Sequence, residues 1–274
     1  MDEVLGNAET SALRQTLVAQ MVQKQLIEKS VVVSGITDVS EFALPGLDNI
    51  DFPRMDNFTV QKKKEDEKVS AKKITFATDR LPLDQEAVVQ WIIPKRSGTQ
   101  SRIALESAAI ANAAAAHALQ ADVDVIEAMA AGAGDSVTLS GDFGVAEIAE
   151  MRKKMRQNWF STLGLTLAVS EDFEEDLLND ANFLNAEKLG SDAVVREGFL
   201  GRALGIDVVV STEMTTARGA RALLYHKQST VIGFQSGPDY EEESALEHLG
   251  RRYSLDQLYG YKVLNSGKGI VKLV

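Results

Sequence analysis

One long alanine-rich run constrains the fold more than any other part of this sequence. Residues 97–134 read SGTQSRIALESAAIANAAAAHALQADVDVIEAMAAGAG, and alanine is the strongest helix-forming residue. Thr99 or Ser101 can cap the start of a helix here, and Gly132 and Gly134 can end it. About thirty residues at 1.5 Å each give a helix of roughly 45 Å, which suits the central spine of an extended molecule.

The composition is that of an ordinary globular protein, and it excludes several kinds of site. The chain has 274 residues, of which 45% are hydrophobic, so it can bury a sizeable core in one large or two modest domains. It contains no cysteine, which excludes disulfides, thiolate zinc sites and cysteine nucleophiles. The formal net charge of −11 argues against direct DNA or RNA recognition. No apolar run approaches the roughly 18 residues of a membrane span, and we expect no secretory signal at the start.

The part before this helix predicts an arm and a long hairpin. Residues 8–29 have apolar positions at helical spacing opposite a face of Gln, Lys and Arg, which predicts an amphipathic helix that packs on another surface. Further on, strand-like pieces around 58–61 and 74–77 flank a charged centre. That centre, Gln61 to Lys73, holds six lysines against three acids. It predicts the polar tip of a hairpin, with a solvated loop as the simpler alternative.

The part after the alanine-rich helix alternates helices and strands without regular βαβ units, which favours an α+β fold. Residues 141–159 predict a helix capped by Asp142, residues 161–170 a strand, and the residues that follow a helix capped by Ser170. Five acids lie early in this last helix: Glu171, Asp172, Glu174, Glu175 and Asp176. They can be read as a carboxylate site of an enzyme, but a solvated face near the positive end of the helix dipole needs fewer assumptions.

The stretch VVREGFLGRALGIDVVVST, residues 194–212, carries Gly198, Gly201 and Gly205, which suggest a phosphate-binding loop. The pattern lacks the Gly-Lys-Ser/Thr ending of a Walker loop and the G-x-G core of the dinucleotide fingerprint. We expect a helix over 191–199 followed by a strand over 205–212, which reverses the strand-to-helix order of phosphate loops. The glycines are therefore interpreted as a structural turn.

No other constellation predicts chemistry. His117, His226 and His248 lie far apart without metal-binding spacing, and the G-x-S-x-G motif is absent. Trp91 and Trp159 are expected to be core or interface anchors. The sequence thus predicts no catalytic residue, no cofactor and no metal site, and we do not expect an enzyme.

The C-terminal part predicts strands and a closing hairpin. Residues 221–235 have strand patterns, and an acidic stretch, Asp239 to Glu243, follows. The chain ends on YGYKVLNSGKGIVKLV, in which two apolar runs flank residues 265–269, a pattern typical of a hairpin.

The order of these elements resembles the major capsid proteins of tailed phages, which have the Hong Kong 97-type fold. VVREGFLGRALGIDVVVST is similar to a segment of that family, commonly G-x-x-G-R-x-x-G followed by an apolar strand ending in Ser. ALLYHKQSTVIGFQ and YGYKVLNSGKGIVKLV then follow in the family's order. The N-terminal half matches by architecture alone. The chain is short for the family, which suggests a minimal or trimmed version.

The resemblance implies a division of the chain into four parts. These are an N-terminal arm (1–30), an extended hairpin loop (54–84), an axial domain (136–235), and a peripheral domain with the spine helix (31–53, 85–135 and 236–274). It also implies a subunit that self-assembles as hexamers and pentamers into the icosahedral capsid of a tailed double-stranded DNA phage. Such a protein is made in the host cytoplasm and is located in the virion.

The resemblance also implies partners and contacts. The partners would be copies of itself and portal, scaffolding and decoration proteins, with DNA enclosed without sequence-specific binding and no membrane involved. The hairpin lysines could face acids such as those at 239–243. The expected contacts between subunits are Lys62, Lys63, Lys64, Lys68, Lys72, Lys73, Arg196 and Arg202.

Three further interpretations of the sequence stay open. Some members of the family join a hairpin lysine covalently to an asparagine of a neighbour, and Asn265 is available, although nothing in the sequence fixes the acid that this reaction needs. An encapsulin-like nanocompartment shares the fold and is an alternative shell function. A soluble acidic α+β enzyme with a carboxylate site at Glu171 to Asp176 is the alternative from another class.

Overall fold

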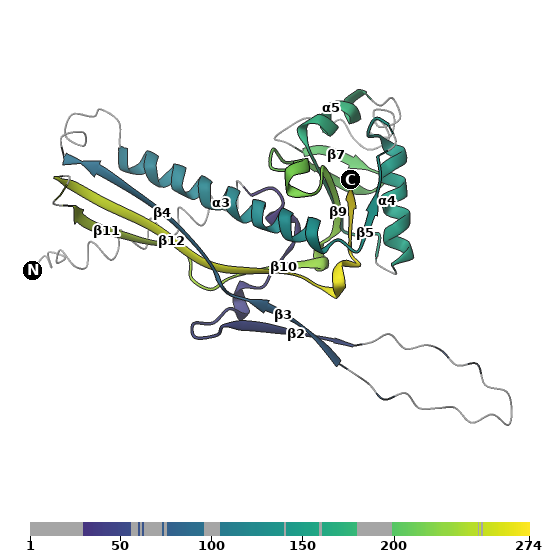
Figure 1. The fold of residues 1–274 in the computed structure, drawn as a ribbon, viewed down its shortest axis with the longest axis horizontal. Coiled ribbons are helices and arrows are strands. Elements are labelled where there is room, and N and C mark those ends of the chain that lie inside the picture. The colour runs from purple at the N-terminus through teal and green to yellow at the C-terminus, as the bar shows by residue number, and fades with distance from the viewer. Residues whose placement is uncertain are drawn as a thin grey trace, which may run out of the picture.

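The computed structural model describes residues 30–55, 60, 62, 73, 76–95, 105–139, 141–158, 161–179, 199–245, 247 and 249–274. These residues form an elongated molecule with a compact body at one end (Figure 1). A long helix and a long sheet extend from the body, and a two-stranded hairpin projects away from them (Figure 1). The predicted arm helix at 8–29 and most of the predicted strand at 58–61 lie outside the described residues.

The long sheet is organised around β12 (Gly250–Val263), a strand of 14 residues. β12 pairs antiparallel with β4 (Gln85–Pro94), β11 (Asp239–Ala245) and β10 (Thr230–Phe234), and the short β1 (Thr37–Asp38) adds to β10 in parallel. Burial alternates along β4, as expected for a sheet with one covered face. On the covered face Trp91 stacks on Tyr253, with 5.7 Å between the ring centroids.

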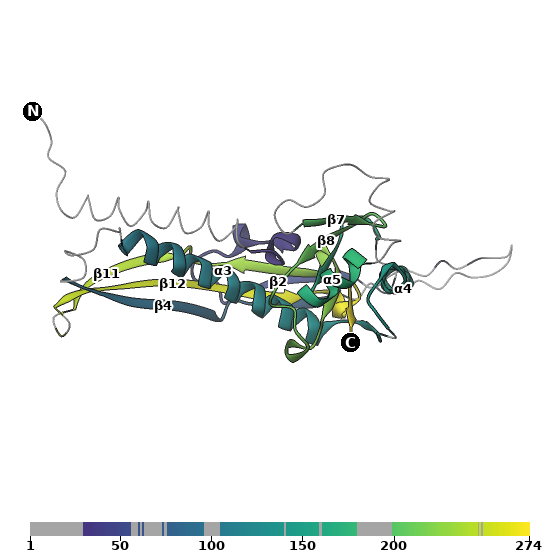
Figure 2. The same ribbon diagram turned by 90° about the horizontal axis from the view of Figure 1, so that it is seen from above.

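α3 (Leu105–Gly132) is the predicted alanine-rich helix, and it lies along the long sheet (Figures 1 and 2). Small side chains let it approach closely, so that Ala114 packs with Leu255 of β12 in one core cluster. Further along, Ile126 packs with Leu223 of the body in a second cluster. One helix therefore joins both cores, which confirms the predicted spine. The two predicted cap residues lie before the described part of the helix.

The compact body is a six-stranded sheet with helices on both faces. Its strand order is β5 (Asp135–Val137), β13 (Ile270–Leu273), β9 (Ala222–His226), β6 (Leu165–Val169), β8 (Ile206–Val210) and β7 (Phe199–Ala203). α4 (Val145–Gln157) and α5 (Glu171–Asn179) pack on one face, and the later part of α3 packs on the other. The consecutive β6 residues Leu167 and Ala168 are both buried because the sheet is covered on both sides.

The projecting hairpin consists of β2 (Asn49–Met55) and β3 (Phe76–Pro82), which pair antiparallel over their whole length. Its base is held by a core cluster in which Leu81 and Leu83 pack with Val231 of the long sheet. A hairpin forms here, but its described pairing joins 49–55 to 76–82, and of the predicted strand pieces only residues 76–77 belong to it. Short 3-10 helices complete the fold: η1 (Val33–Gly35), η2 (Ser40–Phe42), η3 (Thr216–Arg218), η4 (Lys227–Ser229) and η6 (Asn265–Gly267).

Three local predictions are wrong. α4 is not capped by Asp142, because its first turn begins at Val145 and Glu147 accepts the amide N–H of Gly144 at 3.0 Å. Ser170 does precede α5, but its buried hydroxyl has no hydrogen-bond partner in the described part of the chain. The closing hairpin does not form, since β12 belongs to the long sheet and β13 to the body.

The glycine stretch also folds differently from the prediction. β7 pairs antiparallel with β8, so Leu204 and Gly205 form a two-residue hairpin turn. Both have positive φ, 52° and 78°, as a type I′ turn requires. Gly205 thus starts a strand as predicted, but Gly201 lies inside β7 and not at a helix end. A strand–turn–strand also excludes a phosphate loop, and the helix predicted before Phe199 falls outside the described residues.

The long sheet joins the body where two backbones cross. The amide N–H of Gly134, just beyond α3, donates to the carbonyl oxygen of Gly267 at 2.9 Å. Gly267 has φ of 71°, and a Cβ at this position would overlap the carbonyl oxygen of Gly132. Only glycine fits there, so the connection from β12 to β13 is fixed against the end of the spine helix.

The predicted domain boundaries stay a prediction, but sheet membership bears on two of them. β10 lies in the long sheet, although we expected residues 136–235 to form the axial domain. β13 lies in the body, although we expected residues 236–274 to belong to the peripheral domain.

Candidate subunit interfaces

The described residues hold no grouping that resembles an active site. No three of their His, Asp and Glu side chains are placed to hold a metal ion, and none of their helices is both long and apolar enough to cross a membrane. His117 is buried, with Nε2 3.2 Å from the carbonyl oxygen of Leu255, and burial lowers the pKa of its imidazole. It is a packed core histidine of the spine helix.

The acids of α5 do not converge on a site. Asp172 forms an ion pair with Arg221 at 3.0 Å, and Asp176 accepts the amide N–H of Phe143 at 3.3 Å. Glu171 and Glu175 are exposed. The arrangement fits a solvated helix face and gives no support to a carboxylate active site.

The projecting hairpin presents apolar side chains to solvent. Val60 is 93% exposed and Phe76 is 68% exposed, while Lys62 and Lys73 are exposed between them in sequence. The other four predicted contact lysines lie outside the described residues. A two-stranded hairpin is marginally stable alone in water, so this one gains most by lying on another surface.

The uncovered face of the long sheet is acidic. Asp256 of β12 stands directly opposite Asp239 of β11, and Glu241 and Glu86 also act on it. Partial burial, followed by the charges of these three acids, raises the pKa of Asp256. Because like charges directly opposite one another destabilise a sheet, this face would be stabilised by a cationic partner.

A loop before the hairpin holds three large apolar side chains in solvent. Phe42, Leu44 and Leu47 are 62%, 60% and 43% exposed. The loop is held in place by the side-chain amide of Gln235, which donates to the carbonyl oxygens of Leu44 at 3.0 Å and Leu47 at 2.7 Å. Apolar residues that are exposed on a fixed backbone are typical of a protein interface.

Asp122 of α3 anchors the start of the described chain. Its carboxylate accepts the amide N–H groups of Val31 and Val33, both at 2.8 Å, and Tyr225 donates to the carbonyl oxygen of Val32 at 3.3 Å. Asp122 is 3% exposed, and burial raises its pKa. This group fixes residues 31–33 against the spine helix and β9.

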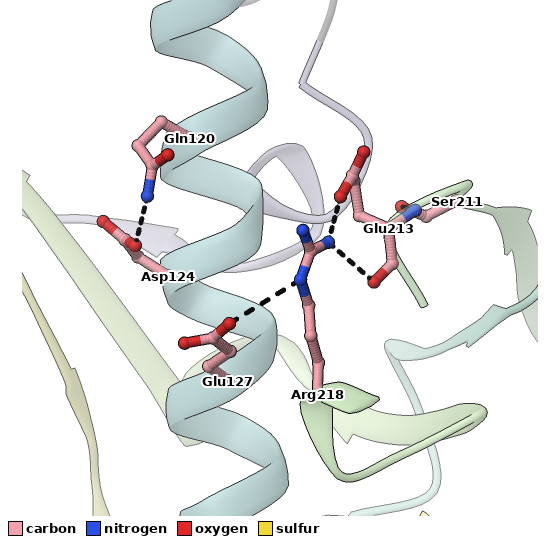
Figure 3. Close-up of polar contacts among 6 residues, drawn as sticks. All are labelled: Gln120, Asp124, Glu127, Ser211, Glu213 and Arg218. Carbon is pink, nitrogen blue, oxygen red and sulfur yellow. Dashed lines mark hydrogen bonds and ion pairs between the residues drawn. The ribbon is translucent and has the colours of Figure 1, made fainter. Parts of the chain in front are cut away.

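Figure 3 shows a second polar cluster on the same helix. Arg218 donates to the side chain of Glu213 and, at 3.0 Å, to its carbonyl oxygen, and Nε lies 3.6 Å from Glu127 of α3. Nearer the start of the helix, Gln120 donates to Asp124 at 2.8 Å. Arg218 therefore ties the loop after β8 to the spine helix.

Sequence reasoning missed several of these residues. Asp122 and Arg218 have no local signal, because their roles depend on segments far away in the chain. The apolar loop could have been found from three large apolar residues at 42–47 beside Pro45 and Gly46, which favour a turn. Arg202 lies in β7 opposite Asp207, and Arg196 lies outside the described residues, so their contact roles stay predictions.

A family model described as phage capsid protein matches residues 97–273. This is more than half of the chain, from just before the spine helix to the last strand. The chain belongs to the phage capsid protein family. The match covers the part of this capsid-family chain that contains the spine helix, most of the long sheet and the whole body.

A curated relative agrees with this membership. The major capsid protein of Escherichia phage T5 is 30% identical over 98 residues, which are 35% of this chain. The match spans only 21% of the T5 protein's own length.

Solved structures show the fold. A chain from Mycobacterium phage Che8 has a TM-score of 0.74 at 19% identity and covers 89% of this chain and 90% of its own. The capsid structure of cyanophage P-SCSP1u has a TM-score of 0.70 at 14% identity, with 89% and 87% covered. A virus-like particle from Pyrococcus furiosus has a TM-score of 0.63 at 10% identity, with 95% and 99% covered. The α+β, Hong Kong 97-type fold predicted from the sequence is therefore confirmed.

Proposed function

We propose that this chain is a major capsid protein that self-assembles into the icosahedral shell of a tailed double-stranded DNA phage. The observation that carries the proposal is the phage capsid family match over residues 97–273. The shape of the subunit supports it, because an elongated molecule with a projecting hairpin has much surface that is useful only when copies overlap. We assign the chain no catalytic role.

The exposed apolar side chains support assembly. Phe42, Leu44 and Phe76 are each at least 60% exposed, although burying such a side chain contributes about 1.5–3 kcal/mol. A monomer forgoes this stabilisation, whereas a shell subunit can recover it at contacts with its neighbours.

We propose that the hairpin lysines of one subunit face the acidic side of the long sheet of another. The cationic set is Lys62, Lys63, Lys64, Lys68, Lys72 and Lys73. Within the subunit Arg252 forms an ion pair with Glu243 at 3.7 Å. Asp239 and Asp256 still stand directly opposite each other, so a cationic side chain from a neighbour would relieve their repulsion. Arg196 and Arg202 are kept as further candidates for contacts between subunits.

A role as a shell subunit implies a location and a set of partners. The subunit occurs in the virion as hexamers and pentamers, is made in the host cytoplasm, and meets portal, scaffolding and decoration proteins. It encloses DNA without reading its sequence, which agrees with a net charge of −11. The division into arm, hairpin loop, peripheral domain and axial domain is part of this proposal. We assign β10 to the peripheral domain and β13 to the axial domain.

The test is the protein content of phage particles released by the organism that carries this gene. We expect this chain to be the most abundant protein in purified virions, identified by mass spectrometry after density-gradient centrifugation. Virions that lack the chain, or hold it only in trace amounts, would refute the proposal.

An encapsulin-like nanocompartment is the second candidate, favoured by the likeness to the virus-like particle from Pyrococcus furiosus. Particle diameter separates the two functions, because a phage shell is the larger and carries a portal at one vertex. Small closed particles without a portal, isolated from cells that release no phage, would favour the nanocompartment.

A further inference from the structure

The body carries two patches of opposite charge that do not meet within one subunit. The first is a hollow of about 450 Å³ beside α4, lined by residues that include Arg152, Lys153, Arg156 and Leu204. The second is a stripe on α5, where Glu171, Glu175 and Leu178 recur at helical spacing and are all exposed. We call the first the basic hollow and the second the acidic stripe.

The charges of both patches are unpaired in the described part of the chain. The three cations of the basic hollow and the two glutamates of the acidic stripe form no ion pair there. The Nε of Arg152 is shielded from solvent and has no acceptor among the described residues. The helix dipole favours cations near the end of α4 and acids near the start of α5, but it does not supply hydrogen-bond partners.

The topology keeps the two patches apart. β5 and β6 run in the same direction, since β5 is parallel to β13 and both β13 and β6 are antiparallel to β9. α4 ends beside the start of β5, where Asn158 donates to Asp135 at 2.6 Å, whereas α5 begins directly after the end of β6. The basic hollow and the acidic stripe therefore lie at opposite ends of the same sheet.

Leu204 adds an independent observation. It occupies the first central position of the β7–β8 turn with φ of 52°, where glycine, asparagine or aspartate is favoured. Its side chain is 37% exposed and lines the basic hollow. A leucine that is unfavourable for the turn and unburied in the subunit indicates a role outside the subunit. Leu178, 41% exposed on the acidic stripe, is the matching apolar residue.

We propose that the acidic stripe of one subunit docks in the basic hollow of the next, with Leu178 against Leu204 between the charges. This inference rests on the proposed self-assembly and names a surface that drives it. Complementary patches at opposite ends of one body produce a head-to-tail contact, and such a contact closes into a ring when the rotation between copies permits it. The unpaired charges then select the neighbour and its register.

Charge exchange tests the contact. Arg152→Glu with Arg156→Glu, or Glu171→Arg with Glu175→Arg, should each reduce the assembled fraction by about tenfold or more, measured by sedimentation and electron microscopy. Combining all four substitutions should restore assembly. Reversal of two exposed lysines elsewhere, Lys227→Glu with Lys262→Glu, is the matched control and should leave assembly near the wild-type level.

Mixing the two charge-reversed variants gives a sharper readout. Each variant repels its own kind but attracts the other, so an equimolar mixture should form six-membered rings, in which the variants alternate. Five-membered rings cannot alternate and should not form.

Leu204→Asn separates assembly from folding. Asparagine suits the turn better, so Tm of the unassembled subunit should rise by about 2–4 °C while assembly weakens. A rise in Tm with unchanged assembly would overturn the role of Leu204.

Several results would overturn the contact as a whole. One is normal assembly of both charge-reversed variants. Another is a four-substitution variant that does not assemble under conditions in which the wild type does. Arg152→Glu/Arg156→Glu shells that form normally but lose co-purifying DNA would assign the hollow to nucleic acid instead. Absence of assembly by the wild type would refute the proposed function itself, and this contact with it.

Discussion

Gly267 is predicted to be the least replaceable residue at the crossing of the long sheet and the body. Gly267→Ala introduces a Cβ that would overlap the carbonyl oxygen of Gly132 and lie 2.8 Å from the amide nitrogen of Gly134. Both obstacles are backbone atoms, so no side-chain rotation can relieve the clash. The substitution should also disturb the hydrogen bond from Gly134 to Gly267.

The magnitude can be built from three contributions. An alanine at φ of 71° costs about 1 kcal/mol, displacement of packed backbone costs about 1–3 kcal/mol, and the hydrogen bond contributes about 1 kcal/mol. The free energy of unfolding should therefore fall by about 3–5 kcal/mol. For a chain of this size, in which 1 kcal/mol shifts Tm by about 2 °C, that lowers Tm by about 5–10 °C.

Two other glycines provide graded controls. Gly205 has φ of 78° and no atom within 4 Å of the place that a Cβ would take, so Gly205→Ala tests backbone strain alone and should cost about 1 kcal/mol. Gly237 has neither positive φ nor a close neighbour, so Gly237→Ala should change stability by less than about 1 kcal/mol. The assay is thermal unfolding of unassembled subunits, followed by circular dichroism. If Gly267→Ala were no more destabilising than Gly205→Ala, the close crossing would be wrong.

Four further predictions concern charged groups. Asp122→Ala leaves two amide N–H groups without their acceptor and should cost about 3 kcal/mol, measured by urea unfolding of unassembled subunits. Because burial raises the folded-state pKa of Asp122, the stability of the wild type relative to Asp122→Asn should fall as the pH rises above about 4; a flat difference would contradict this. Arg218→Ala should cost about 1–2 kcal/mol and increase hydrogen exchange of the loop after β8, and an unchanged exchange rate would exclude its role as a tether. Reversing Lys62, Lys63 and Lys64 to glutamate should impair assembly while arginine at the same positions preserves it, and normal shells from the reversed variant would exclude the lysine–acid contact.

The sequence predicts elements whose signal is local. The alanine-rich helix is confirmed because helix propensity and spacing agree over many consecutive residues. The strands at 221–235 are found because short apolar and β-branched runs there are bounded by turn residues. The Hong Kong 97-type fold is recognised from the order of these elements together with the glycine stretch.

Features that depend on distant partners are not predicted. The two apolar runs at the C-terminus are correctly interpreted as strands, but their pairing in different sheets is decided by β10 and β9, far upstream. The turn at Leu204 is not predicted because leucine is a poor residue for a type I′ turn. Asp122 looks like one more polar residue of a helix, and only the fold places two backbone amides on it. The basic hollow likewise needs α4 and the β7–β8 turn to be brought together.

Electron microscopy of the purified chain shows directly whether the subunit assembles into a shell. The protein is expressed alone, concentrated under assembly conditions and imaged, with sedimentation velocity to measure the distribution of sizes. We predict closed shells of uniform diameter built from five-membered and six-membered rings. A stable monomer or small oligomer at every concentration and salt tested would contradict this prediction.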